Sequence, residues 1–431
     1  MNKLALFDGP KTITKPFQRY NTIGTEEMKA VEGVVKTGVL SQYLGEWSPD
    51  FYGGEMVQKF ERAWEEYFKV KNAVTVNSNT SGLMAAVGAI GIEPGDEVIV
   101  SPWTMSASAT AILVWNAIPV FADIEHETFN LDPVSIEENI TPYTKAIMVT
   151  DIFGHAADLD SIMLLAKKHN LKVIEDSAQA PGAIYKGKYV GTIADIGVFS
   201  LNYHKHIHTG EGGVCVSNDP DLAKRMRLIR NHAEAVVEDK GVTDLSNMIG
   251  FNFRMTEIES AIGIEQLKKL DSLLEGRICS SERISRGVKD LKGLRVPVVK
   301  PDCTHVYYGY PLVFSEEEVG VSRNQIVDAL RAEGIPVAGG YCNLHMLPMY
   351  QQKKAYGSKG FPWSAEFYKG NVSYKKGICP VAEELQEKSY IGIGVSTRKY
   401  TNEDVDLIIK AFHKVWNNLD ELRELSSPEI A

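Results

Sequence analysis

The chain has 431 residues, of which 44% are hydrophobic and 24% are charged, and its formal net charge is −10. This composition excludes a largely disordered chain, and the length leads us to expect about two or three domains. The negative net charge argues against a general nucleic-acid binder. No apolar run approaches the ~20 residues of a membrane span. We therefore expect neither a nucleic acid nor a membrane as a partner.

The N-terminal residues and the cysteines indicate the cellular compartment in which the protein is expected. The first residues lack an apolar core long enough for a signal peptide. The five cysteines are odd in number and far apart, and no two of them form a CxxC pair. Reduced thiols in a cytoplasmic protein, without a metal site, are the simplest interpretation.

The first long stretch of the chain alternates between strand and helix patterns. An amphipathic helix is predicted between Met56 and Phe68, where apolar residues recur at spacings of three and four. From residue 72 to 217, short β-rich runs alternate with helical stretches such as Ile162–His169, which indicates a largely parallel sheet covered on both faces. The predicted strands are Ala73–Val76, Val98–Val100, Pro119–Ala122, Ala146–Val149, Val173–Ile174, Gly197–Ser200 and Gly213–Val216.

The pattern changes after about residue 255. Apolar spacing predicts a long helix over Glu257–Leu274, followed by shorter strand and helix patterns at Gly309–Phe314 and Arg323–Arg331. We interpret the long helix as a connection into a smaller α/β domain. The predicted organisation is a large domain over residues 1–270, which includes the N-terminal segment, and a small C-terminal domain over residues 271–431.

Two polar segments follow predicted strands of the large domain. The small hydroxyl and amide residues of Asn77–Gly82 either cap the helix that they begin or bind a phosphate through its free N–H groups. Val173–Ala180 runs from a strand into Glu175 and Asp176. Carboxylates at the C-terminal end of a parallel strand lie where open α/β sheets bind ligands, although a solvated strand end with an N-cap explains the same pattern.

A third segment, Phe199–Gly213, contains a lysine between histidines. Lys205, if buried and flanked by cationic histidines, would have a lowered pKa and serve as a nucleophilic amine. The alternative is a metal site, because His204, His206 and His208 would share one face of an extended strand. No carboxylate or cysteine at metal-like spacing completes such a site apart from the nearby Glu211.

The fourth segment, Gly250–Glu257, precedes the long predicted helix. Thr256 is expected to cap that helix, which leaves Asn252 and Arg254 unexplained.

Taken together, the four segments offer a phosphate-binding helix start, a buried acid, a serine near the phosphate and a reactive lysine, which are what pyridoxal phosphate requires. The lysine forms a Schiff base with this cofactor, and the acid keeps the pyridine nitrogen protonated.

These segments, in this order, make the chain resemble the DegT/DnrJ/StrS family of sugar aminotransferases. The similarity runs from about Asn21 to about Phe412, and Gly191–Ser200 fits a GTxxDxGxFS pattern. Two further stretches, Gly95–Val100 and Pro380–Glu384, also match. The resemblance implies a pyridoxal 5'-phosphate-dependent transferase of fold type I, with a mostly parallel seven-stranded sheet in the large domain and a smaller C-terminal α/β domain.

The resemblance also implies roles for single residues. Lys205 matches the Schiff-base lysine, Asp176 the acid that pairs with the pyridinium nitrogen, and Gln179 the residue near the phenolic oxygen of the ring. Ser200 and Thr80 match ligands of the cofactor phosphate.

Other matches concern the subunit interface and departures from the family pattern. Asn252 matches a phosphate ligand from a second subunit, which implies a homodimer with shared active sites. Asn79 stands where the family usually has glycine, so we expect a different backbone conformation there. The family usually stacks an aromatic ring on the cofactor where this chain has Met105, and Trp103 lies two residues before it. The sequence leaves open which of these two side chains contacts the cofactor. Further candidates for polar contacts near the substrate are His155, His232, His305 and His345, although a purely structural histidine explains each of them equally well.

The expected activity is transfer of an amino group, with glutamate as the expected donor, to a keto group of a nucleotide-linked sugar or related polyol. Such a reaction belongs to amino-sugar, surface-polysaccharide or natural-product biosynthesis. Two alternatives stay open. A deoxysugar dehydratase on the same scaffold carries histidine in place of the lysine, and a non-catalytic regulatory relative would not need Lys205, Asp176 and Gln179 intact.

Overall fold

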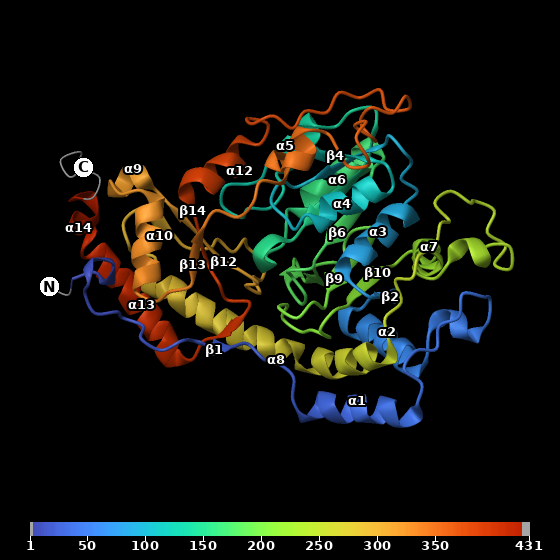
Figure 1. Ribbon diagram of the computed structural model, residues 1–431, viewed down its shortest axis with the longest axis horizontal. Helices are drawn as coiled ribbons and strands as arrows, with labels where there is room; N and C mark the ends of the chain where they lie inside the picture. The colour runs from blue at the N-terminus through green and yellow to red at the C-terminus, as the bar shows by residue number, and fades with distance from the viewer. Residues whose placement is uncertain (1–2, 425–431) are drawn as a thin grey trace.

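The computed structural model describes residues 3–424, and a seven-stranded sheet forms its centre (Figure 1). The strand order is β2-β10-β9-β6-β5-β3-β4, and only β10 runs antiparallel to its neighbours. The mostly parallel seven-stranded sheet that the resemblance predicts is therefore confirmed. Its strands are β2 (Asn72–Val76), β3 (Glu97–Val100), β4 (Ile118–Phe121), β5 (Thr144–Thr150), β6 (Lys172–Asp176), β9 (Ile196–Ser200) and β10 (Gly213–Ser217).

Helices bury this sheet, so its strands are apolar along their length rather than alternating. The helix predicted near residues 56–68 is α2 (Glu55–Phe68), which buries Phe60, Trp64 and Phe68. Helix α3 (Asn79–Ala89) packs against α4 (Ala107–Val114) and α7 (Pro220–Arg230).

Helix α3 begins close to the ends of two strands because of a glycine. A Cβ atom on Gly82 would lie 2.7 Å from Cγ1 of Val198 and 2.9 Å from Sγ of Cys215. Only a residue without a side chain allows the first turn of α3 to approach β9 and β10 this closely. Consequently, the start of α3 lies beside β9 and β10, and Nδ2 of Asn79 in its first turn reaches Oδ1 of Asp176 at the end of β6.

Helix α8 is the longest of the described chain, running from Glu257 to Val288 (yellow in Figure 1). Thr256 caps it as predicted, since its side chain accepts a hydrogen bond from the N–H of Glu259 in a capping box. The helix continues beyond Leu274, where the sequence predicts its end. Gly276 and later serines interrupt the apolar pattern there, but Ile284 and Val288 are buried in a second core.

This second core lies around a four-stranded antiparallel sheet of order β11-β12-β14-β13. Leu4 and Ile13, near the N-terminus, are also buried in it. The two cores meet along α8, and the division at residue 270 stays a prediction. The elements of this part are β11 (Leu294–Arg295), β12 (Tyr310–Phe314), α9 (Glu316–Val319), α10 (Arg323–Ala332), β13 (Val337–Gly339), β14 (Tyr390–Ile393), α13 (Asn402–Trp416) and α14 (Leu419–Glu424).

A two-stranded ribbon joins segments from the two ends of the chain. Strand β1 (Gln18–Arg19) pairs antiparallel with β15 (Arg398–Lys399) beside α8 (Figure 1).

The remaining α-helices and β-strands are α1 (Thr25–Thr37), α5 (Pro133–Glu138), α6 (Leu159–His169), β7 (Ile184–Tyr185), β8 (Lys188–Tyr189), α11 (Pro348–Gln351) and α12 (Pro380–Glu384). All five cysteines are unpaired. Between residues 3 and 424, no helix combines the length and the apolar character that crossing a membrane requires.

Candidate active site

A cavity of about 230 Å³, here called the inner cavity, lies at the C-terminal ends of β6 and β9. The first turn of α3 and the loop between β9 and β10 border it, and Tyr308 and Tyr341 approach from the C-terminal half of the chain. The fold brings seven of the predicted site residues to this cavity. They are Asn79, Thr80, Met105, Asp176, Gln179, Ser200 and Lys205.

Lys205 is buried in the loop that follows β9. Its Nζ atom lies 4.2 Å from the centre of the Tyr308 ring, in a cation–π arrangement. Burial lowers the pKa of Lys205 to about 8, although the negative charge of Asp176 opposes this shift. With this pKa, about a tenth of the amine is unprotonated at pH 7, far more than in an ordinary lysine, and the unprotonated amine is the form that acts as a nucleophile.

Of the two predicted causes of this lowered pKa, burial of Lys205 is confirmed and the charge of the flanking histidines is wrong. Burial lowers the pKa of both His204 and His206, so these rings are neutral at neutral pH rather than cationic. In addition, Nε2 of His206 lies 2.9 Å from the carbonyl oxygen of Val306, in a hydrogen bond that directs this ring to the backbone. Removal from water, and not the charge of neighbouring histidines, accounts for the reactive amine.

Asp176 ends β6 and is held from three sides. Oγ of Ser108 donates to Oδ2 at 2.8 Å, Nδ2 of Asn79 donates to Oδ1 at 3.1 Å, and the N–H of Ala178 donates to Oδ1 at 3.3 Å. Burial raises the pKa of Asp176, whereas the Ser108 hydrogen bond and the charge of Lys205 oppose this shift. A buried carboxylate of this kind gains strongly from a cationic hydrogen-bond donor placed beside it.

The segment Asn77–Gly82, for which phosphate binding is predicted, forms a helix cap. Oγ of Ser78 accepts a hydrogen bond from the N–H of Ser81 at 3.0 Å, which confirms the capping interpretation for this residue. Thr80 and the Ser200 side chain border the inner cavity next to this helix start. The first N–H groups of a helix lack acceptors within it, and the positive end of the helix dipole favours an anion there.

The residues that line the inner cavity fit pyridoxal 5'-phosphate. The inner cavity presents an amine for its aldehyde, a buried carboxylate for its ring nitrogen and a helix N-terminus for its phosphate. Moreover, Oδ1 of Asn79 is buried with no hydrogen-bond partner, which leaves an acceptor free beside the carboxylate.

The side chains expected around the cofactor ring differ in their surroundings. Oε1 of Gln179 accepts from the N–H of Phe153 at 2.7 Å, which fixes its orientation. Met105 is 66% exposed and borders the inner cavity. Trp103 is fully buried, and its Nε1 donates to Oδ1 of Asn343 at 2.7 Å. Of the two side chains that the sequence leaves open, only Met105 borders the cavity.

Asn252 is exposed and lies outside the inner cavity of its own chain. Its carbonyl accepts from Nδ2 of Asn77 at 3.3 Å, and its Oδ1 accepts from Nε of Arg254 at 2.7 Å. A role for Asn252 in a second subunit stays a prediction.

The other histidines do not border the inner cavity. Nε2 of His155 accepts from the N–H of Lys300 at 3.1 Å, and Nδ1 of His305 accepts from the N–H of Tyr307 at 3.0 Å. His345 pairs with Glu383, and His232 lies beside Gly45.

The alternative of a metal site at His204, His206 and His208 required an extended strand, but the segment 204–208 is a bent loop. Nowhere in residues 3–424 do three His, Cys, Asp or Glu side chains form a group suited to a metal.

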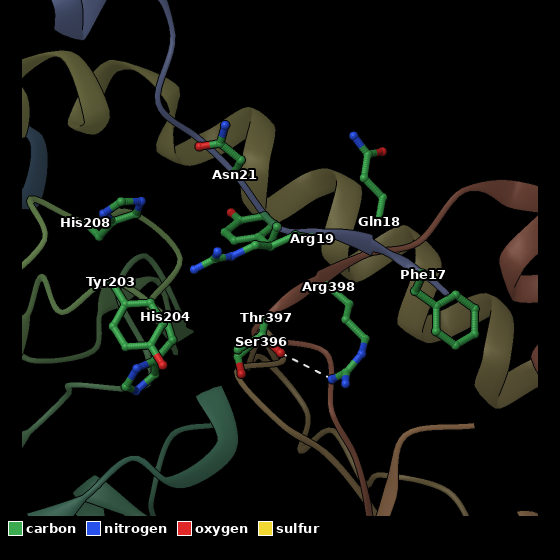
Figure 2. A pocket seen from close by; sticks show the side chains of 11 residues that line it. Phe17, Gln18, Arg19, Asn21, Tyr203, His204, His208, Ser396, Thr397 and Arg398 are labelled. Carbon is green, nitrogen blue, oxygen red and sulfur yellow. Dashed lines mark hydrogen bonds between the residues drawn. The ribbon is translucent and has the colours of Figure 1, made fainter. Parts of the chain in front are cut away.

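Figure 2 shows the lining of a larger cavity of about 850 Å³, here called the outer cavity. His204 borders both cavities. The ribbon β1–β15 forms one side of the outer cavity, and Tyr203, His204 and His208 from the loop after β9 form another. Sequence reasoning missed this cavity because its walls come from segments almost 400 residues apart.

Comparison with known proteins agrees with this geometry. Residues 22–389 match the DegT/DnrJ/EryC1/StrS aminotransferase family. GDP-perosamine synthase of Caulobacter vibrioides is 39% identical over 302 residues, which cover 69% of this chain and 79% of that protein. L-Glutamine:2-deoxy-scyllo-inosose aminotransferase of Streptoalloteichus tenebrarius is 32% identical over 359 residues, which cover 80% of this chain and 83% of that protein.

The fold is similar to a solved aminotransferase structure from Psychrobacter cryohalolentis. The TM-score is 0.80 at 29% sequence identity, and the match covers 94% of this chain and 100% of the other. Fold and site together define an aminotransferase of a pyridoxal phosphate-dependent class. The chain belongs to the DegT/DnrJ/EryC1/StrS aminotransferase family.

The burial of Lys205 leads to a prediction about its titration. In the cofactor-free protein we expect the amine to titrate near pH 8, because its pKa is lowered to about 8. The unprotonated fraction then rises with pH well before that of an ordinary lysine, whose pKa is ~10.4. Labelling with an amine-reactive reagent over a pH series, read by mass spectrometry, measures this midpoint. Lys186 is an internal control, because its hydrogen bond to Asp160 raises its pKa. A midpoint above pH 10 for Lys205 would contradict the prediction.

Proposed function

We propose that this protein transfers an amino group from glutamate to a keto group of a nucleotide-linked sugar or a related polyol. The observation that carries the proposal is the inner cavity, which holds the buried Lys205 amine together with the buried Asp176 carboxylate. The names of the two relatives support a keto-sugar or keto-cyclitol acceptor. We further propose that the reaction serves amino-sugar biosynthesis, for a surface polysaccharide or a natural product, in the cytoplasm.

Each residue of the inner cavity has a part in this proposal. Pyridoxal 5'-phosphate, when bound, supplies an electron sink for cleavage of a bond to hydrogen at the carbon that carries nitrogen. Lys205 would hold the cofactor covalently, and its amine would move a proton at that carbon as a general acid and base. Its lowered pKa suits both tasks, because the amine can be deprotonated and reprotonated near neutral pH.

The remaining side chains bind and orient the cofactor. Asp176, fixed by Ser108 and Asn79, stabilises positive charge on the ring nitrogen through a charge-assisted hydrogen bond. A cation at that position also favours the ionised form of this carboxyl group, against the effect of burial. The residues assigned to the rest of the cofactor are Thr80 and Ser200 at its phosphate, Gln179 at its phenolic oxygen and Met105 at its ring.

The two alternative functions receive no support from this site. A dehydratase would need a histidine where this cavity has Lys205, and the neighbouring His206 ring is turned to the carbonyl of Val306. A non-catalytic protein would have no reason to bury an unpaired lysine amine at a cost in stability.

Replacing Lys205 tests the proposed function. We predict that Lys205→Ala loses the covalent, borohydride-reducible link to the cofactor and lowers turnover by roughly 10³-fold or more, because no other primary amine borders the inner cavity. His204→Ala, one residue away, is the matched control and should keep the link. Absorbance before and after reduction, and amino transfer from glutamate and from glutamine to a panel of keto-sugar nucleotides and keto-cyclitols, measure the two effects. Near-normal turnover of Lys205→Ala would refute the assignment.

We also propose a homodimer in which each subunit completes the active site of the other. Asn252 is exposed and outside its own inner cavity, and helix α1 with the loop after it exposes several large apolar side chains. These are Met28, Val35, Val39, Leu40, Leu44 and Trp47. A set of this kind on one part of the surface is typical of a protein interface.

The dimer is tested by sedimentation together with one substitution. We expect the wild type to sediment as a dimer, and Asn252→Ala to remain a dimer that binds pyridoxal 5'-phosphate about tenfold more weakly, since a hydrogen bond to a charged group is lost. A fully active monomer would contradict the proposal.

A further inference from the structure

The two carboxylate oxygens of Asp176 have different hydrogen-bond partners. Oδ2 accepts from Oγ of Ser108 at 2.8 Å, whereas Oδ1 accepts from Nδ2 of Asn79 at 3.1 Å and from the N–H of Ala178 at 3.3 Å. Within residues 3–424, Asn79 is thus the one side chain that donates to Oδ1. A buried carboxylate has lost the water that would solvate its charge, so its stability as an ion depends on each remaining donor.

The local structure of α3 does not account for an asparagine at position 79. Asn79 is the first residue of this helix, and it is Ser78 before it that forms the N-cap. The φ angle of Asn79 is not positive, so the tolerance of asparagine for left-handed backbone is not used here. Asparagine is also a poorer helix former than alanine. The contact of the Asn79 amide with Asp176 remains as the reason for this side chain.

The protein uses only half of the hydrogen-bonding capacity of this amide. Oδ1 of Asn79 is buried with no hydrogen-bond partner, which is costly for an acceptor removed from water. Because Nδ2 of the same amide donates to Asp176, the free oxygen lies close to the carboxylate. A cationic donor that reaches the carboxylate from the inner cavity therefore comes near a second acceptor. This pair of side chains suits a positively charged ring nitrogen better than a neutral one.

Asn79 also acts on the charge of Asp176. Burial raises the pKa of this carboxyl group, whereas the hydrogen bonds from Ser108 and Ala178, the charge of Lys205 and the hydrogen bond from Asn79 lower it. An amide donates more strongly to an ionised carboxylate than to a neutral carboxyl group. Loss of the amide would therefore favour the neutral form of Asp176.

We propose that Asn79 is a positioning residue that keeps Asp176 ionised opposite the cofactor ring. The inference rests on the proposed function and deepens it. The amide acts through the carboxylate, which in turn holds the positive charge on the ring nitrogen. A glycine, which the family usually has at this position, would leave Oδ1 of Asp176 with the N–H of Ala178 alone. The contribution of Asn79 to cofactor binding should consequently depend on the presence of the ring nitrogen.

A binding cycle tests this role without turnover. The two ligands are pyridoxamine 5'-phosphate, which has no aldehyde to react with Lys205, and its 1-deaza analogue, in which carbon replaces the ring nitrogen. Both are titrated into the cofactor-free protein by calorimetry, and the nitrogen preference is the ratio of the two affinities. We expect the wild type to prefer the ligand with the ring nitrogen. Asn79→Ala should lower this preference about tenfold, since it removes a hydrogen bond to a charged group.

A purely structural role of Asn79 would give a different result. A disturbed helix start or phosphate site would weaken both ligands equally and leave the nitrogen preference unchanged, and this outcome would overturn the proposal. Asn79→Gly is a second variant that removes the same donor, and we expect it to lower the preference to the same extent.

Asn202→Ala is the matched control. Asn202 also borders the inner cavity, but its Nδ2 donates to the two carboxylate oxygens of Glu211, at 2.8 and 2.9 Å. We expect this variant to change the nitrogen preference by less than about twofold. A loss as large as that of Asn79→Ala would show that the effect is not specific to the donor at Asp176, and it would also overturn the proposal.

The wild type separates failure of this inference from failure of the proposed function. If the proposed function is wrong, the wild-type protein does not bind pyridoxamine 5'-phosphate, and the role of Asn79 falls with it. If only the role of Asn79 is wrong, the wild type binds this ligand and prefers it to the 1-deaza analogue, and Asn79→Ala keeps the same preference.

Discussion

Burial of an amine and a carboxylate in one small cavity is the constraint on which the rest of this structure depends. Removal from water is the largest cause of both the lowered pKa of Lys205 and the raised pKa of Asp176. Buried charges are costly unless they are paired and hydrogen-bonded. The chain meets this requirement by bringing Ser108 from α4 and Asn79 from α3 to the carboxylate.

A chain of hydroxyl groups extends this support into the sheet. Oγ of Ser108 lies 2.9 Å from Oγ1 of Thr104, which accepts a hydrogen bond from Oγ1 of Thr150 at 3.2 Å. Thr150 ends β5, the strand next to β6. The orientation of Asp176 therefore depends on two helix starts and two strand ends at once, and the close approach of α3 at Gly82 is part of the same arrangement.

Sequence patterns predicted the parts of the fold that are local or buried on both faces. The central strands are recognisable because parallel strands covered by helices are apolar throughout. Ribbon β1–β15 has two residues in each strand and joins segments near the two ends of the chain, so no local sequence pattern predicts it. The end of α8 was missed for a related reason, since only contacts with the second core explain why the helix continues past Gly276.

In the site, too, residues in local motifs were predicted, whereas residues brought in from distant parts of the chain were not. Lys205, Asp176 and Ser200 were predicted from short motifs, because each follows or ends a strand of the sheet. Tyr308 and Tyr341, which close the inner cavity, were not predicted, since they come from the C-terminal half and lie in no recognisable motif. The lowered pKa of Lys205 and its burial were predicted correctly. The predicted contribution of cationic histidines was wrong, because the sequence does not show that these rings are buried as well.

The central claim is that a buried, ionised Asp176 acts on the cofactor held by Lys205. The most direct measurement is the rate of the single-turnover reaction with glutamate in Asp176→Asn, which keeps the shape of the side chain and removes its charge. Our account predicts that the cofactor stays linked to Lys205 while this rate falls by roughly 10²-fold or more, because the ring nitrogen loses its charge-assisted hydrogen bond. A rate close to that of the wild type, with the cofactor fully bound, would contradict it.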